Sequence, residues 1–366
     1  MILKSFFQKM KPLNWGIVGL IFVIAALGWG LLISAAGGDI SPWASKQIVR
    51  FSIGILIMGG VALTNLRWWL QFSYIFYWIS FVLLCGVECM GFMGMGAERW
   101  IDLYVIQLQP SELMKIALVM ALARYFHSQS LPLSLAKVWF PTLLVLLPVC
   151  LVLRQPDLGT AMVLLLTGGM MFFLAGVSLW FFGVALMGAA ASIPLLWNFL
   201  YDYQKNRILI FFDPGQDALG KGYHINQSKI ALGSGGLWGK GYMQGTQASL
   251  GFLPEKQTDS IFTLLCEEWG FMGGLFLIGL YVVLLIACFR IILTTQNVFG
   301  RFVAAGITIT FFLYVFINIG MVMGLLPVVG VPLPLVSYGG TALLTLLMGF
   351  GFLLNVGAHR TAKLPR

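Results

Sequence analysis

The feature that most constrains this chain is its series of long apolar runs. The first extends from about residue 14 to residue 36, and similar runs follow along almost the whole sequence. Runs of about 18 or more apolar residues are typical of membrane-spanning helices. Hydrophobic residues make up 59% of the chain and charged residues 10%, whereas an average soluble domain is about 25% charged. The sequence therefore predicts an all-α polytopic membrane protein.

About ten membrane helices can be placed, and we expect them to form a single integral membrane domain, residues 1–366. The predicted ranges are 14–36, 47–64, 69–92, 111–127, 137–153, 158–176, 178–198, 259–289, 301–323 and 338–357. The shortest join, at residues 176–178, divides the stretch 158–198 into two helices.

The distribution of Lys and Arg predicts the orientation, because these residues are more frequent in cytoplasmic loops. With the N-terminus inside, the cytoplasmic side carries Lys4, Lys9, Lys11, Arg67, Arg124, Lys137, Arg290, Arg301, Arg360, Lys363 and Arg366. The short outer loops carry Lys46, Arg50, Arg99 and Arg154. An even number of helices then places both termini in the cytoplasm. One large extracytoplasmic loop, about residues 199–258, remains between helices 7 and 8, and its many glycines predict tight turns lying against the bundle.

The same distribution explains the net charge of +9, so no nucleic-acid partner is predicted. The five cysteines contain no CxxC pair, and the three histidines are scattered. These spacings predict neither a disulfide framework nor a zinc site.

Ionisable residues at the mouths of membrane helices are candidates for function. In residues 96–115, Pro110 suits a helix start, and Glu112 and Lys115 lie three apart, so they can pair on one helix face. Two interpretations stay open: an internal ion pair, or a lysine that meets an anionic substrate. In residues 153–161, Pro156 and Asp157 mark another helix start, where Asp157 is expected to cap or stabilise the helix, with Arg154 nearby.

Two further segments lie later in the chain. Asp259 is expected to be the N-cap or a first-turn acid of the eighth helix, and Glu267 or Glu268 should face the bundle interior. Residues 324–344 contain three prolines, which forbid a regular helix and favour a re-entrant or cavity-lining segment. Ser337 is expected to be the N-cap of the last helix.

Together these segments resemble the SEDS family of bacterial cell-wall synthases, and within it the elongation branch, RodA, more than the division branch, FtsW. The matching strings span most of the chain and occur in the family's order: GAERWIDL, QPSELMK, QPDLGTA, FFDPGQDALGKGYHINQSKIALGSGGLWGKG, GTQASLGFLPEKQTDSIF, EEWGFMGG and PVVGVPLPLVSYGG. The chain departs from the usual HTDF pattern at Gln257 and Ser260, and Ala218 stands where a proline is common. No departure removes a carboxylate.

The resemblance implies a peptidoglycan glycosyltransferase of the bacterial cytoplasmic (inner) membrane, with its active site on the periplasmic side. Such an enzyme polymerises lipid II into β-1,4-linked glycan, with inversion at the MurNAc C1 and release of undecaprenyl pyrophosphate. Its partner would be a class B penicillin-binding protein, a transpeptidase, within the elongation machinery.

The resemblance also suggests roles for individual residues. Asp259 would be the catalytic base, and cations would stabilise the departing pyrophosphate, helped by a bridging divalent ion, Mg²⁺ or Mn²⁺. Candidate substrate-binding residues are Lys115, Arg154 and Arg99 for the phosphates, Glu112 to hold Lys115, Asp157 for a sugar or the metal, Trp100 for a sugar ring or the interfacial aromatic belt, Lys240 and Gln247 for glycan or partner contacts, and Ser337.

Other classes of function stay open at this point. A lipid II flippase or transporter also suits ten helices with buried charges, although it predicts charges near the bilayer midplane. A non-catalytic scaffold of the elongation machinery is a third interpretation, compatible with an enzymatic role.

Overall fold

The computed structural model describes residues 13–90, 92–94, 97–102, 107–199, 205, 209, 221–253 and 255–365. Each of the ten predicted helices overlaps one observed helix. They are α2 (Trp15–Ala35), α3 (Trp43–Leu63), α4 (Leu66–Met90), α5 (Pro110–Ser128), α6 (Trp139–Arg154), α7 (Leu158–Leu174), α8 (Leu179–Phe199), α12 (Ile261–Thr294), α13 (Val298–Val322) and α14 (Thr341–Ala358). The helical fold class is confirmed.

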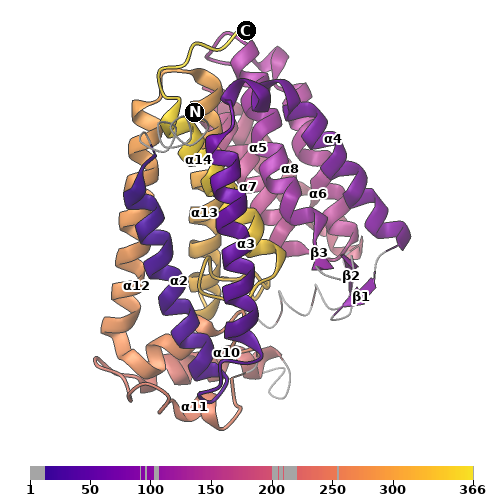
Figure 1. The fold of residues 1–366 in the computed structure, drawn as a ribbon. Coiled ribbons are helices and arrows are strands. Elements are labelled where there is room, and N and C mark those ends of the chain that lie inside the picture. Colours follow the sequence, from indigo (N-terminus) through magenta and orange to yellow (C-terminus); the bar gives the residue numbers. More distant parts are fainter. Residues whose placement is uncertain are drawn as a thin grey trace, which may run out of the picture.

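In the described part of the chain, six helices are long and apolar enough to cross a membrane: α2, α3, α4, α12, α13 and α14. The apolar helices α6 and α7 and the apolar part of α8 are shorter. The helices run between two ends of the bundle, one holding both chain termini and the other holding the 221–253 region (Figure 1). Ten spans and two cytoplasmic termini stay predictions.

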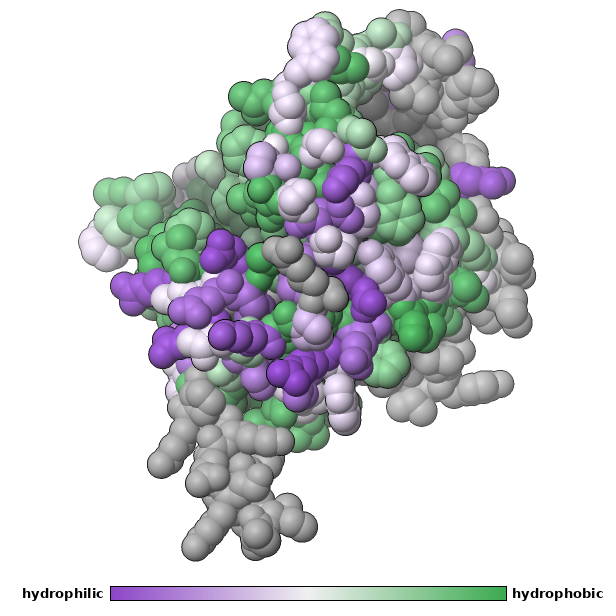
Figure 2. All heavy atoms as spheres, turned by 90° about the horizontal axis from the view of Figure 1, so that it is seen from above, coloured by the Kyte–Doolittle hydropathy of each residue, from purple (hydrophilic) through white to green (hydrophobic). Residues whose placement is uncertain are grey.

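Hydrophilic residues gather on the end that holds the termini, as the view onto that end shows (Figure 2). Exposed basic side chains at the helix ends on this side are Arg67, Arg290, Arg301, Arg360 and Lys363. This gathering agrees with the orientation predicted from the loop charges.

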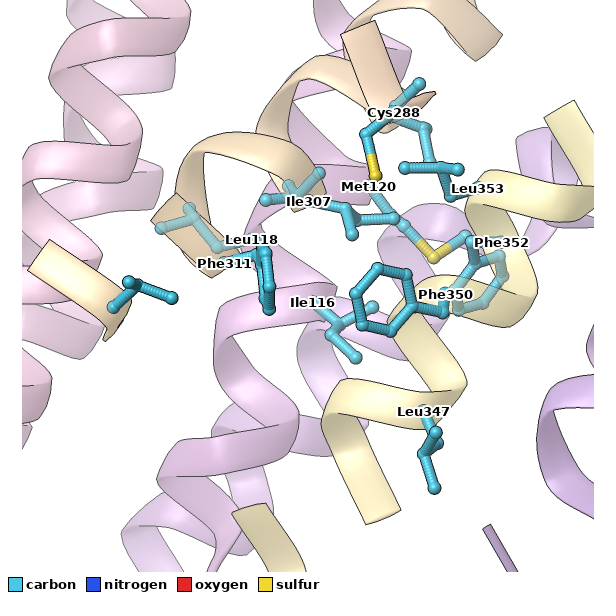
Figure 3. Close-up of a cluster of buried hydrophobic side chains, with 14 of the residues drawn as sticks. Ile116, Leu118, Met120, Cys288, Ile307, Phe311, Leu347, Phe350, Phe352 and Leu353 are labelled. Carbon is cyan, nitrogen blue, oxygen red and sulfur yellow. The ribbon is translucent and has the colours of Figure 1, made fainter. Parts of the chain in front are cut away.

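The core is centred on α5, α13 and α14, with α12 packed beside them (Figure 3). Helix α5 buries residues on every face, including Met114, Leu118 and Leu122. Phe311 of α13 packs edge-to-face on Phe350 of α14 at a ring-centroid distance of 5.3 Å. Helix α5 contacts α4, α6, α7, α13 and α14, so it is held at the centre from several sides.

A short antiparallel sheet, which the sequence analysis did not predict, joins α4 to α5. It consists of β1 (Phe92–Gly94), β2 (Ala97–Asp102) and β3 (Gln107–Leu108), in the order β1-β2-β3. Trp100 of β2 pairs with Phe92 and is half-buried. The side chain of Arg99 lies outside the described residues.

The division between α7 and α8 is confirmed. Gly176 adopts φ +75°, and a Cβ there would stand 2.8 Å from the Cβ of Pro132. Only glycine fits both the left-handed backbone and the close contact, so the chain turns sharply between Leu174 and Leu179.

The described part of the 199–258 loop lies against the bundle, as predicted. Tight turns occur at Gly236, Gly239 and Gly241, which all have positive φ. The loop also contains α10 (Lys221–Ser234), which packs on α12 and was not predicted, and the short α11 (Thr246–Ser249). Ala218 lies outside the described residues.

Helix α12 is broken at Gly270, where φ is 68° and ψ is −166°. The loop around Gly239 fills the break. Four main-chain hydrogen bonds connect them: Lys240 N to Glu267 O (3.0 Å), Gly241 N to Glu268 O (2.9 Å), Phe271 N to Gly236 O (2.9 Å) and Met272 N to Leu237 O (3.2 Å). A break in a membrane helix is tolerated where other parts of the protein form hydrogen bonds with the freed backbone groups. Here the loop around Gly239 provides those hydrogen bonds.

Candidate functional site

The site is organised by the non-helical segment between α13 and α14, residues 324–340. Its middle is buried: Leu333, Leu335 and Val336 are at most 3% exposed. A Cβ on Gly28 would stand 2.7 Å from the Cα of Val336. Gly28 lies seven residues before the last residue of α2, or about 10 Å along its axis. The segment therefore enters the bundle, as its three prolines predicted.

The N-termini of four helices meet this segment. Helix α14 follows it directly, and the first turns of α5 line a cavity with it. A Cβ on Gly159, in the first turn of α7, would stand 2.7 Å from the carbonyl oxygen of Val329. The turn before α12 is hydrogen-bonded to Ser337. Helix N-termini carry partial positive charge, so this end of the bundle favours an anion.

A cavity of about 50 Å³ lies between the segment and helices α5, α13 and α14. Its polar lining comes from Glu112, Lys115, Thr310, Tyr314, Ser337 and Thr345. A cavity of this size has room for about three or four water molecules.

Glu112 and Lys115 form a buried ion pair, with 2.6 Å between Lys115 Nζ and Glu112 Oε1. Tyr314 donates its hydroxyl hydrogen to Glu112 Oε2 at 2.8 Å, and Lys115 Nζ also contacts that hydroxyl. Thr345 approaches Glu112 Oε2 at 3.4 Å. The two charged residues are 6% and 4% exposed, so of the two interpretations this geometry matches the internal ion pair. Tyr314 completes the group and was missed by the sequence analysis.

Asp157 is the N-cap of α7, as expected. Its carboxylate accepts hydrogen bonds from Thr160 N (3.1 Å) and Thr160 Oγ1 (2.9 Å). Gln109, the N-cap of α5, donates its Nε2 hydrogen to Asp157 Oδ2 at 3.3 Å, the same oxygen that accepts from Thr160 Oγ1. Asp157 thus connects the starts of two helices. Arg154, the last residue of α6, is exposed.

Asp259 is not part of α12, so its assignment as an N-cap or first-turn acid was wrong. The N-cap is Ser260, and the first turn contains no acid. The N–H groups of Thr258 and Ser260 both donate to Glu255 O, at 2.9 and 3.4 Å, which makes a separate turn before the helix. Asp259 lies in this turn and is half-buried.

Main-chain carbonyls hold the turn in place. Asn318 Nδ2 donates to Asp259 O (3.3 Å), Ser337 Oγ donates to Thr258 O (2.6 Å), and Tyr338 N donates to Gln257 O (2.8 Å). Asp259 Oδ2 lies 3.6 Å from the place that a Cβ on Gly330 would occupy. The carboxylate therefore faces the 324–340 segment, while the backbone of its turn is fixed from three sides.

Ser337 does not cap the last helix, and that prediction was wrong. Helix α14 begins at Thr341, after Gly340. The Ser337 hydroxyl accepts from Leu333 N at 2.8 Å and donates to Thr258 O. The hydroxyl therefore holds the segment against the Asp259 turn and does not cap α14.

Lys240 and Gln247 surround a different carboxylate. Lys240 Nζ lies 2.9 Å from Glu267 Oε1, and Gln247 N donates to the same oxygen at 2.9 Å. Glu267 is fully buried and Glu268 is 2% exposed, so the expectation that one of them faces inward is confirmed. Lys240 and Gln247 hold the outer loop on α12, and their contacts with glycan or a partner stay predictions.

The structure thus brings only some of the predicted site residues together. Glu112, Lys115 and Ser337 line one cavity, whereas Asp157 and Asp259 lie near other parts of the same segment. Among the residues that the structure describes, no three His, Cys, Asp or Glu side chains gather as metal ligands. A divalent cation at this site would therefore need ligands from the substrate as well.

Comparison with known proteins identifies the family. The model of the FtsW/RodA/SpoVE family, described as cell cycle proteins, matches residues 9–362. This chain belongs to that family. It is 45% identical over 344 residues to the peptidoglycan glycosyltransferase MrdB of Escherichia coli K12, with 93% of each protein covered.

Solved structures of the family share the fold. One, from a study of how a peptidoglycan synthase complex coordinates polymerisation and crosslinking, matches with a TM-score of 0.84 and 32% identity, over 96% of this chain and 99% of that one. The rod shape determining protein RodA of Thermus thermophilus matches with a TM-score of 0.73 and 30% identity, over 96% and 98% of the two chains. The family resemblance stated from the sequence motifs is confirmed.

Proposed function

We propose that this chain is a peptidoglycan glycosyltransferase of cell elongation. It polymerises lipid II into β-1,4-linked glycan on the outer face of the cytoplasmic membrane. The main support is the 45% identity to an E. coli protein of that activity, over 93% of both chains. The site adds a carboxylate placed beside a segment where several helix N-termini meet.

Asp259 is the general base in this proposal. The acceptor, a GlcNAc 4-hydroxyl, is a poor nucleophile until a base removes its proton, and a positioned carboxylate accelerates such a step by about 10²–10⁴-fold. The single observation that carries the role is the way its turn is held. Three hydrogen bonds fix the main chain of residues 257–259, and this positions the half-buried carboxylate.

The 4-oxygen attacks C1 of the donor MurNAc as the bond from C1 to the pyrophosphate oxygen breaks, which inverts C1. The proton moves to Asp259, and undecaprenyl pyrophosphate leaves as an anion. The leaving group therefore needs positive charge more than a proton. Helix N-termini at the 324–340 segment supply partial positive charge. The proposed side-chain contacts are Arg154, which is exposed, and Arg99. Lys115 is enclosed by Glu112 and Tyr314. In this proposal its positive charge therefore acts on the pyrophosphate at a distance and not by direct contact.

Glu112 holds Lys115, Asp157 orients a sugar, and Trp100, Lys240, Gln247 and Ser337 line the path of the glycan in this proposal. A divalent cation, Mg²⁺ or Mn²⁺, would enter with the pyrophosphate, because Mg²⁺ is often held by substrate phosphates and only one or two carboxylates. No step above uses it.

The proposed partner is a class B penicillin-binding protein that crosslinks the new glycan within the elongation machinery. The support is the match to a chain from a complex that couples polymerisation to crosslinking. Co-purification of this chain with that transpeptidase tests the pairing.

The experiment for the base uses Asp259→Asn, purified with its partner and supplied with lipid II. Asparagine keeps the shape and every main-chain contact, so we expect a folded protein whose polymerisation rate falls by about 10²–10⁴-fold. Glu255→Gln, an exposed carboxylate in the same turn, is the matched control and should keep the wild-type rate. Polymerisation by Asp259→Asn at a rate within threefold of wild type would rule out Asp259 as the general base. Movement of lipid II across the vesicle membrane without polymerisation would instead favour a transporter function.

A further inference from the structure

An open groove of about 430 Å³ lies on the flank of the bundle, where the outer loop enters the break in α12. Its walls are aromatic: Trp238 and Tyr242 from the loop, and Trp269 and Phe276 from α12. Trp238 is 79% exposed and Phe276 is 52% exposed. Tryptophan and tyrosine concentrate where a membrane meets water, so we expect the groove at the level of the lipid headgroups.

Glu268 is the only acid among the residues that line this groove. It is 2% exposed. Ser34 donates to its Oε1, and the main-chain N–H of Met243 points toward the carboxylate. Its Oε2 has no hydrogen-bond partner within the described residues.

The neighbouring Glu267 provides a direct contrast. Both of its oxygens accept hydrogen bonds, and Lys240 neutralises its charge. Burying a carboxylate oxygen without a donor is costly. Glu268, with one buried oxygen unpaired beside the groove, is therefore suited to a ligand that carries a donor and a positive charge.

Tyr242 is held as part of the wall. Its hydroxyl donates to Gly30 O at 2.8 Å. Partial burial, and secondly the charge of Glu268, raise the pKa of the Tyr242 hydroxyl. The phenol thus stays neutral, and its ring remains a face for a cation.

The groove continues into an apolar crevice between α2 and α12. Trp269, Gly273 and Phe276 line both spaces, and the crevice adds Leu27, Leu31 and Leu277. Along α12, the surface thus changes from a buried carboxylate with aromatic rings to leucine side chains. This order matches an amphiphile with a cationic headgroup and a hydrocarbon chain.

We propose that the groove binds an amine-bearing phospholipid, with its ammonium group against Glu268 and the aromatic rings and one acyl chain over the exposed apolar side chains that flank the crevice, such as Phe276. An ammonium group donates the missing hydrogen bond, and the faces of the aromatic rings attract its positive charge. A bare metal ion fits less well, because Ca²⁺ takes six to eight oxygen ligands and the groove offers one carboxylate. The proposal does not depend on the glycosyltransferase activity.

The test is native mass spectrometry of the delipidated protein titrated with phosphatidylethanolamine or with phosphatidylglycerol of the same acyl chains. We expect wild type to bind the amine lipid at least tenfold more tightly, and Glu268→Gln, which keeps the shape but removes the charge, to bind the two lipids equally. Glu255→Gln, a carboxylate outside the groove, should keep the wild-type preference.

Trp238→Ala provides a second variant that leaves the buried residues in place, because this ring is largely exposed. It should weaken binding of the amine lipid severalfold. A phosphatidylethanolamine with a photoreactive acyl chain should label residues 265–277 of α12 or residues 27–31 of α2. Equal binding of both lipids by wild type, an unchanged preference in Glu268→Gln, or labelling confined to helices other than α2 and α12 would each overturn the proposal.

Discussion

Replacing Gly270, at the break in α12, should destabilise the protein by an amount that follows from the structure. Gly270 has φ 68° and ψ −166°, a region open essentially to glycine, where another residue costs about 1–3 kcal/mol. A Cβ there would also overlap the main-chain nitrogen of Gly239 and stand 2.6 Å from Leu237 O. Gly270→Ala must therefore displace the loop from the break.

Displacing the loop breaks the four main-chain hydrogen bonds that connect it to α12. At about 1 kcal/mol each, together with the strain, the loss is about 5–7 kcal/mol. We expect a large fall in the thermal midpoint in detergent and faster proteolysis within residues 235–253. Glycan polymerisation should fall as well, since the same loop leads into the Asp259 turn.

Gly279→Ala is the matched control, because a Cβ at this position in the same helix meets nothing within 4 Å. Alanine favours a helix over glycine by about 1 kcal/mol, so this variant should be as stable as wild type or slightly more. The reasoning is refuted if Gly270→Ala melts within a degree of the control and its loop resists protease equally.

Three further outcomes are expected. Lys115→Met leaves the Glu112 carboxylate buried without its cation and should destabilise the protein by about 3–5 kcal/mol, measured as a lower thermal midpoint; an unchanged midpoint would contradict the ion pair. Asn318→Ala removes the hydrogen bonds to Val331 O and Asp259 O, each worth about 1 kcal/mol, and should lower kcat with little change in KM, because it loosens the base rather than the substrate site. Removal of divalent cations with EDTA should slow polymerisation, because the proposed cation enters with the pyrophosphate. It should leave the thermal midpoint unchanged, because the described residues contain no cluster of three metal ligands.

The helices could be predicted because their signal is local. A membrane helix must present apolar residues over its whole length, since hydrocarbon offers no hydrogen-bond partners. The Asp157 cap is local too: its main partner, Thr160, lies three residues away. For the same reason the Glu112–Lys115 pair could be read from a spacing of three.

The wrong assignments involve residues whose partners are distant in sequence. Ser337 contacts Thr258, 79 positions away, and Asn318 contacts Asp259, 59 positions away. Nothing in the residues next to Ser337 or Asp259 distinguishes these contacts from helix capping. Tyr314 could not be predicted either, because a single tyrosine in an apolar helix resembles an ordinary core residue. Its partner, Glu112, lies 202 positions away in the sequence.

The way in which the Asp259 turn is held explains how the chain tolerates Gln257, where the family usually has histidine. The contact at this position is made by the main-chain carbonyl, which accepts from Tyr338 N at 2.8 Å. A change of side chain leaves that bond intact, so Asp259 should stay in place. We therefore expect Gln257→His to polymerise lipid II within about twofold of wild type at every pH, whereas Asp259→Asn in the same background should lose activity. A rate that rises or falls tenfold through the titration range of histidine, near pH 6.5, would show that the side chain at residue 257 takes part in proton transfer and that the main-chain contact alone does not define the base.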